Sequence, residues 1–108
     1  MGFRKPDSET EYAMILGASS GFGEAVAMEL AQAGFNIIGI HMDRGSGLSR
    51  VDQIKSRIRE HQVEALYFNI NAAAEKKRHE VIDKLKELFS TSKKPQKIKV
   101  LLHSLAFG

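Results

Sequence analysis

The fold is decided by the stretch YAMILGASSGFG, residues 12–23, together with the alanine-rich segment that follows it. The first five residues of this stretch are a continuous apolar run, which is typical of a strand buried on both faces. From Gly21 onward, alanines and regularly spaced apolar residues favour a helix, and Gly34 can end that helix as a left-handed cap. A glycine-rich segment therefore joins a buried strand to a helix.

The same alternation of strand and helix continues along the chain. A helix with Ser49 as its N-cap is predicted from apolar residues at helical spacing up to Ile58, and a second one from the same spacing over 81–89. Apolar and β-branched runs bounded by loop-forming residues predict three more strands, at 35–41, 65–70 and 98–102.

This order of elements, βαβαβαβ with short linkers, predicts an α/β fold in which helices cross over between parallel strands. We expect half of a doubly wound Rossmann-type parallel sheet with its four strands in the order 3-2-1-4. Residues 1–11 are polar and charged and are expected to form a flexible N-terminal arm, whereas residues 12–108 form an N-terminal dinucleotide-binding half-domain.

The last predicted strand, 98–102, is rich in Val and Leu, and a parallel strand of that composition normally has a neighbour on each side. No further strand follows it, so the sequence predicts a truncated domain and self-association of the chain through the edge of this strand. The alternative is a natural small domain whose edge is covered by the N-terminal arm or by a partner chain.

Composition excludes several classes of protein. With 108 residues, 43% hydrophobic and 27% charged, the chain is expected to be one soluble globular domain or part of one. The absence of cysteine excludes a disulfide scaffold, a thiolate metal site and a cysteine nucleophile, and agrees with a cytoplasmic location.

Charge and spacing exclude further partners. The net charge of +3 is scattered and does not favour nucleic acid, and no apolar run is long enough to span a membrane. The four histidines are separated by 20, 18 and 24 positions, so we predict no metal site.

The segment Gly17-Ala18-Ser19-Ser20-Gly21-Phe22-Gly23 lies where this kind of fold binds a nucleotide phosphate, between a strand and the start of a helix. Gly17 permits a tight turn, Gly21 lets the backbone approach a pyrophosphate, and Gly23 allows close packing of helix on strand. Glu24 follows in place of the Lys of a triphosphate-binding loop, so triphosphate hydrolysis is disfavoured. The alternative is a flexible turn that binds nothing.

This loop and the elements around it resemble the cofactor loop of the short-chain dehydrogenase/reductase family, although Leu16 stands where the family usually has Thr. The family uses NAD or NADP. The resemblance implies that Ser19, Ser20 and Phe22 lie along the pyrophosphate and ribose with the three glycines. It also implies that Asn69-Ile70, after the third strand, contact adenine, although Asn69 could equally be a turn residue.

The final segment, His103-Ser104-Leu105-Ala106-Phe107-Gly108, resembles the enoyl-acyl-carrier-protein reductase branch of the family. In that branch the corresponding backbone lies beside the ribose on the nicotinamide side. Ser104, Leu105 and Ala106 are therefore candidate cofactor contacts. The glycine loop departs from the branch, which usually has a longer loop with fewer glycines.

The residues after the second strand bear on the choice of cofactor. Asp43 lies 20 positions beyond Gly23, where an acid would accept hydrogen bonds from the adenosine ribose of NAD. Arg44 could instead pair with the 2′-phosphate of NADP, with His41 and Arg50 as further donors. By the family pattern, the acidic residue that binds the ribose of NAD would stand at position 41. This chain has His41 there, which favours NADP slightly. A solvated, salt-bridged turn is the alternative for Asp43 and Arg44.

Hydride chemistry in this family needs a tyrosine and a nearby lysine. The chain has only Tyr12 and Tyr67, and neither has Lys four positions later, so we predict no catalytic residue and an inactive chain. The predicted function is the NAD(P)-binding portion of an oxidoreductase that transfers hydride in the full-length protein. The alternatives are a non-enzymatic NAD(P)-binding sensor or interaction module and a methyltransferase-like domain that binds an adenosyl ligand.

Overall fold

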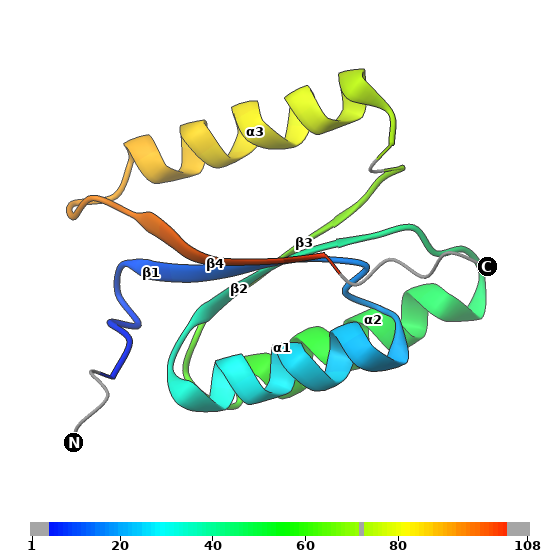
Figure 1. Ribbon diagram of the computed structural model, residues 1–108, viewed down its shortest axis with the longest axis horizontal. Coiled ribbons are helices and arrows are strands. Elements are labelled where there is room, and N and C mark those ends of the chain that lie inside the picture. The colour runs from blue at the N-terminus through cyan, green and yellow to red at the C-terminus, as the bar shows by residue number, and fades with distance from the viewer. Residues whose placement is uncertain (1–4, 72, 104–108) are drawn as a thin grey trace.

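The computed structural model describes residues 5–71 and 73–103, which form one four-stranded parallel sheet with three helices (Figure 1). The strands follow the order β3-β2-β1-β4, which confirms the predicted α/β fold and the order 3-2-1-4. The elements are β1 (Glu11–Leu16), α1 (Gly21–Ala33), β2 (Asn36–His41), α2 (Ser46–Arg59), β3 (Ala65–Asn69), α3 (Glu75–Ser90) and β4 (Lys97–His103).

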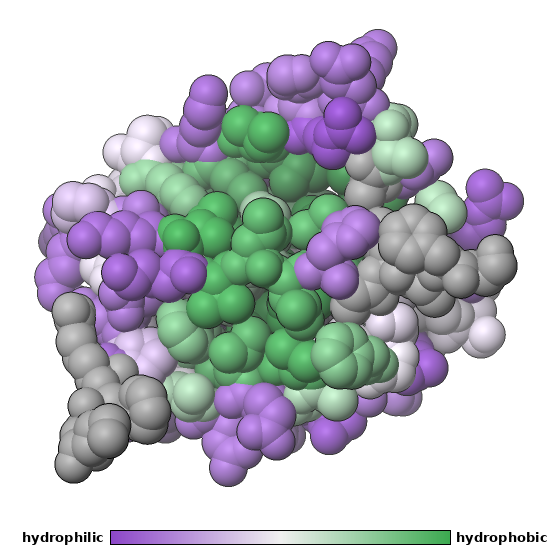
Figure 2. All heavy atoms as spheres, in the orientation of Figure 1, coloured by the Kyte–Doolittle hydropathy of each residue, from purple (hydrophilic) through white to green (hydrophobic). Residues whose placement is uncertain are grey.

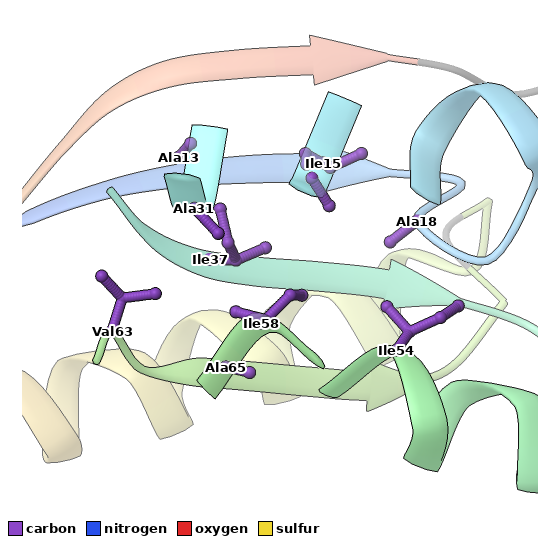
Figure 3. Packing of buried hydrophobic residues seen from close by; sticks show 10 residues of the cluster. Ala13, Ile15, Ala18, Ala31, Ile37, Ile54, Ile58, Val63 and Ala65 are labelled. Carbon is purple, nitrogen blue, oxygen red and sulfur yellow. The ribbon is translucent and has the colours of Figure 1, made fainter. Parts of the chain in front are cut away.

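The helices cover the two faces of the sheet unequally. Figure 1 shows α1 and α2 side by side on one face and α3 alone on the other. The larger buried cluster lies under α1 and α2, where Ile15 and Ile37 of the sheet pack against Ile54 and Ile58 of α2 (Figure 3). Since successive strand residues point to opposite faces, β1 and β2 also supply a second cluster under α3. That is why the middle of each of these two strands is apolar.

The edge strand β4 is much more exposed than β1 and β2. The Leu101 side chain is 68% exposed and Ile98 is 43% exposed. Figure 2 shows an apolar area in the middle of the face on which Figure 1 places β4. The second edge of β4 therefore presents both backbone hydrogen-bonding groups and apolar side chains.

The ends of α1 match the sequence prediction. Ser20 is the N-cap, and its Oγ accepts a hydrogen bond of 3.0 Å from the Gly23 N–H. Gly34 ends the helix with φ 115°, and its N–H donates to the carbonyls of Ala31 and Leu30. An L-residue would be strained in this left-handed cap.

The predicted start of α2 is wrong. Ser49 lies inside the helix, which begins at Ser46 and has Gly45 as an N-cap without a side-chain hydrogen bond. Gly45 has φ 58°, and the amides of Gly47 and Leu48 donate to the carbonyls of Arg44 and Gly45, both at 3.1 Å. Because backbone carbonyls close this first turn, no capping side chain marks it in the sequence.

The segment before β1 is attached to the sheet from Asp7 onward, whereas the sequence predicted a flexible arm through residue 11. The Asp7 amide donates to the Glu11 carboxylate at 2.9 Å, and the buried Asn36 side chain donates to the Ser8 carbonyl at 2.8 Å. Glu11 already belongs to β1, and residues 1–4 lie outside the described part of the chain.

Candidate functional site

The candidate site residues that the structure describes lie near the carboxyl end of the sheet. Parallel strands place their carboxyl ends at one edge, so the loops after β1, β2 and β3 meet there. The glycine loop after β1 is fixed to β2, because the amides of Gly17 and Ala18 both donate to the Ile40 carbonyl, at 2.9 and 3.0 Å. Gly17 has φ 82°, a left-handed conformation that favours glycine.

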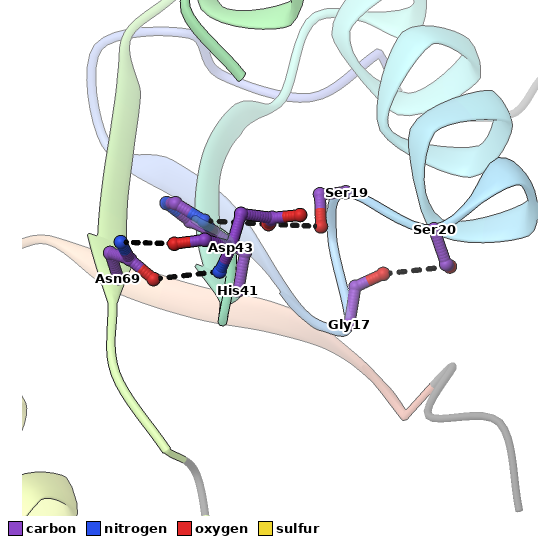
Figure 4. Close-up of polar contacts among 6 residues, drawn as sticks. All are labelled: Gly17, Ser19, Ser20, His41, Asp43 and Asn69. Carbon is purple, nitrogen blue, oxygen red and sulfur yellow. Dashed lines mark hydrogen bonds and ion pairs between the residues drawn. The ribbon is translucent and has the colours of Figure 1, made fainter. Parts of the chain in front are cut away.

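Ser20 organises the turn from this loop into α1. Its hydroxyl donates to the Gly17 carbonyl at 2.8 Å and accepts from the Gly23 amide (Figure 4 shows the first bond). The amides of Gly21 and Phe22 have no hydrogen-bond partner among residues 5–71 and 73–103. A Cβ added at Gly21 would have no atom within 4 Å. Two free amides at a helix N-terminus, facing open space, can hold an anion.

The one acidic side chain in the first turn of α1, Glu24, is matched by basic groups from α2. Its carboxylate oxygens lie 3.4 Å from Arg50 and 4.0 Å from Arg57. Since Glu24 is about one quarter exposed and both arginines are more than half exposed, these pairs are partly screened. They reduce the repulsion that an anion at the helix start would meet.

Asp43 joins the glycine loop to the end of β2. Its Oδ2 accepts a hydrogen bond of 2.5 Å from the Ser19 hydroxyl and lies 3.0 Å from Nδ1 of His41 (Figure 4). The His41 side chain is 4% exposed and that of Asp43 is 24% exposed. The structure thus brings together three residues that the sequence predicted separately.

Asn69 fixes the backbone of Asp43 from the end of β3. The Asp43 amide donates to Asn69 Oδ1, and Asn69 Nδ2 donates to the Asp43 carbonyl, both at 3.0 Å. Asn69 is exposed, so its amide group lies at the surface of the site. The residue predicted to contact adenine therefore also holds the loop that carries Asp43.

The remaining predicted site residues are distributed around this cluster. Phe22 is 64% exposed at the start of α1, and the Arg44 side chain is exposed in the loop after β2. Ile70 packs with the apolar cluster on the α3 face of the sheet. Ser104, Leu105 and Ala106 lie outside the described residues.

Sequence reasoning missed a contact between β2 and β3 behind this cluster. A Cβ at Gly39 would lie 2.5 Å from the Tyr67 ring, so the ring crosses β2 where a side chain is absent. The ring centroids of Tyr67 and His41 are 5.9 Å apart. A glycine inside an apolar strand was the available signal, because it often marks close approach of another group.

Both tyrosines of the chain are held in their neutral form. The Tyr67 hydroxyl is buried and has no hydrogen-bond partner in the part of the chain that the structure describes, and burial, with a smaller contribution from the charge of Glu24, raises its pKa. Burial, followed by the charge of Glu64, also raises the pKa of Tyr12. Neither side chain lies on a helix with a lysine beside it, as the family's proton donor would.

A family model described as short chain dehydrogenase matches residues 11–104. The chain belongs to the short-chain dehydrogenase family. A curated relative is the uncharacterized short-chain type dehydrogenase/reductase y4eK of Sinorhizobium fredii (strain NBRC 101917 / NGR234). The relative is 44% identical to this chain over 41 residues. Those residues make up 38% of this chain and 16% of the relative.

Solved structures of the short-chain dehydrogenase family share the fold. A bulky-bulky ketone specific alcohol dehydrogenase from Comamonas testosteroni is 30% identical with a TM-score of 0.68, over 92% of this chain and 37% of that one. A NAD+-bound xylitol dehydrogenase has a TM-score of 0.69 and 22% identity, over 91% of this chain and 33% of that one. The present short-chain dehydrogenase chain thus spans about a third of these structures.

Among the residues described, no three His, Asp or Glu side chains are grouped so that they could hold a metal ion. No helix in that same part of the chain has the length and apolar character needed to cross a bilayer.

Proposed function

We propose that this chain is the NAD(P)-binding portion of a short-chain dehydrogenase/reductase-type oxidoreductase. The observation that carries this proposal is the pair of amides at Gly21 and Phe22, which have no hydrogen-bond partner among the residues described, at the start of α1, where a Cβ on Gly21 would meet no atom within 4 Å. A diphosphate fits such a site because it accepts hydrogen bonds and its charge is favoured by the helix dipole. Two neighbours in fold, named as a NAD+-bound xylitol dehydrogenase and a NADH-dependent reductase complexed with NAD, support a dinucleotide.

The adenosine end of the dinucleotide would lie over the ends of β2 and β3. Asn69 and the loop from Asp43 to Arg44 are at the surface there. We propose a slight preference for NADP, because Arg44 is exposed and Asp43 Oδ2 already accepts a hydrogen bond from Ser19 and lies beside His41 Nδ1. An arginine can pair with a 2′-phosphate, whereas a carboxylate with fewer free acceptor sites offers less to a ribose hydroxyl.

The bound nicotinamide would supply hydride transfer in the whole protein. The residues of this chain would bind and orient the adenosine diphosphate half of the cofactor. Tyr12 is buried in β1, Tyr67 is half-buried in β3, and both keep their protons, so we assign neither as a proton donor. The chain alone is expected to be inactive, and the enoyl-acyl-carrier-protein reductase branch and a cytoplasmic location remain predictions.

Titration calorimetry with NADP+ and NAD+ tests the proposal. We expect micromolar or weaker binding, because only part of the dinucleotide is contacted. Gly21→Asp should abolish dinucleotide binding, because the new carboxylate would repel the diphosphate at the helix start. The helix itself should tolerate the change, because an acidic side chain is favourable near a helix N-terminus. Gly21→Asn is the matched neutral control and should retain more binding.

Two outcomes would overturn the proposal. One is equal binding by the wild type and Gly21→Asp, which would place the dinucleotide elsewhere. The other is tighter binding of S-adenosylmethionine than of either dinucleotide, which would favour the methyltransferase-like alternative. A non-enzymatic sensor would show the same dinucleotide binding, so hydride transfer by the whole protein distinguishes it from the enzyme.

We also propose that the chain self-associates through the free edge of β4. Among the residues described, no strand pairs with this edge, and Leu101 of β4 is 68% exposed, so a second copy of the strand would satisfy the backbone groups and cover the apolar side chain. A two-fold pair of edges is the simplest closed arrangement of identical chains.

A further inference from the structure

We propose that His41 makes the choice between NADP and NAD depend on pH, by carrying a proton beside Asp43 when a 2′-phosphate is bound. This inference rests on the proposed function, because it concerns the adenosine end of the same site. The observation behind it is the hydrogen-bonded set Ser19, Asp43 and His41 at the end of β2 (Figure 4).

The geometry couples the charge of His41 directly to that of Asp43. Nδ1 of His41 lies 3.0 Å from Oδ2 of Asp43, the same oxygen that accepts the Ser19 hydroxyl. With a neutral imidazole, the pair carries the full negative charge of the carboxylate. With an imidazolium, the pair is neutral overall. Its interaction energy with an uncharged ribose hydroxyl then changes little, whereas its repulsion of a negatively charged 2′-phosphate falls greatly.

The position of the pair brings this charge to the ribose. Asp43 and the exposed Arg44 are neighbours in the loop after β2, where the family fold receives the ribose of the adenosine. Asn69 holds that loop in place through two hydrogen bonds to the Asp43 backbone. A negative Asp43 opposes Arg44 in binding a 2′-phosphate, and protonation of His41 removes that opposition.

The other charged and titratable groups near this cluster, among the residues described, lie on α1, α2 and β3. Glu24 of α1 is paired with Arg50 and Arg57 of α2, and arginines stay charged. Tyr67 of β3 contacts the His41 ring and stays neutral, since burial raises its pKa. The glycine loop contributes Ser19, which does not titrate. His41 is the histidine that contacts Asp43, and histidine is the side chain whose ordinary pKa lies between acid and neutral solution.

The test measures the dissociation constants of NADP+ and NAD+ from about pH 5.5 to about pH 8.5, the interval in which histidine titrates. The 2′-phosphate of NADP+ itself titrates with a pKa of about 6, which alters NADP+ binding in any protein. Comparing the wild type with His41→Asn removes this contribution, because it is common to both. The asparagine stays neutral and can still donate to Asp43. Toward low pH, we expect the NADP+ preference of the wild type to rise about tenfold relative to that of His41→Asn.

A matched control comes from a second histidine–acid pair. His79 of α3 lies 3.6 Å from Glu75, and both side chains are exposed on the other face of the sheet. His79→Asn should leave the pH dependence of the preference as in the wild type. Parallel pH profiles for the wild type and His41→Asn would overturn the inference and leave the proposed function standing. Failure of both dinucleotides to bind at every pH would overturn the proposed function itself.

A measurement on the wild-type protein covers the case in which His41→Asn does not fold. By linkage, NADP+ binding should take up protons near neutral pH, whereas NAD+ binding should take up fewer. Calorimetry in two buffers of different ionisation enthalpy counts these protons. If His41 took no part, a cationic site would favour the deprotonated phosphate, and NADP+ binding would release protons. Net proton release with NADP+, or the same uptake with NADP+ as with NAD+, would therefore overturn the inference.

Discussion

At the scale of the residue, Gly17 and Gly21 differ in backbone conformation although both belong to the glycine loop. Gly17 has φ 82°, whereas Gly21 begins α1 and a Cβ there would meet nothing within 4 Å. Gly17→Ala should lower the free energy of unfolding by about 1 to 2 kcal/mol, because an L-residue is strained in the left-handed region. Gly21→Ala should not lower it. Urea denaturation of the two variants checks this, and equal losses would contradict it.

The buried hydroxyl of Tyr67 gives a second prediction at this scale. Because this hydroxyl has no hydrogen-bond partner within residues 5–71 and 73–103, Tyr67→Phe should raise the free energy of unfolding by about 1 kcal/mol at neutral pH. Folding raises the pKa of Tyr67, so the native state keeps its proton above pH 10, where the unfolded chain loses it. The stability of the wild type should therefore fall above about pH 10 and that of Tyr67→Phe should fall less steeply. Denaturation curves on both sides of that pH, if parallel for the two proteins, would refute the assignment.

The sequence predicted individual site residues better than their mutual contacts. Ser19, His41 and Asp43 could be named from the glycine pattern, the strand ends and the family resemblance. That Ser19 donates to Asp43 follows only from the folded arrangement, because the two residues are 24 positions apart. The contact between Tyr67 and Gly39 could not be predicted, because it joins two strands that are far apart in the sequence.

At the scale of the element, Ser20 and Ser49 have different places in their helices, although only Ser49 was expected to be a cap. Ser20 caps α1, whereas Ser49 is exposed inside α2. Ser20→Ala should lower the melting temperature and cost about 1 kcal/mol, because the Gly23 amide loses its acceptor. Ser49→Ala should be neutral or slightly stabilising, since alanine favours a helix interior. A loss of stability in Ser49→Ala as large as that in Ser20→Ala would restore Ser49 as the cap.

The order of the elements was predictable because each type leaves a periodic pattern of apolar residues. The middle of β1 and of β2 is apolar because both faces of the central strands are covered, and α3 repeats its buried residues Val81 and Leu85 at helical spacing. Boundaries set by the backbone leave no such pattern. The start of α2 depends on the conformation of Gly45, and the turn before β1 depends on hydrogen bonds from Asn36.

At the scale of the whole molecule, the free edge of β4 governs association. Leu101→Lys should convert a self-associating chain into a monomer, because each pair of edges would bring two ammonium groups onto an apolar surface. Leu48→Lys is the matched control, since Leu48 is also exposed but belongs to α2, which packs beside β3 at the other edge of the sheet. Light scattering at increasing protein concentration measures both, and a wild type of monomeric mass throughout would refute the proposal.

The hydrogen bond between Ser19 and Asp43 has an evolutionary consequence. It ties a position in the loop after β1 to one in the loop after β2, so the two cannot drift independently. A lineage that replaced the acid to accept another cofactor would leave the serine hydroxyl without its acceptor, and a compensating change at position 19 would then be favoured. Substitutions at the two sites should therefore be epistatic, and engineered shifts in cofactor preference should succeed more often when both are varied together.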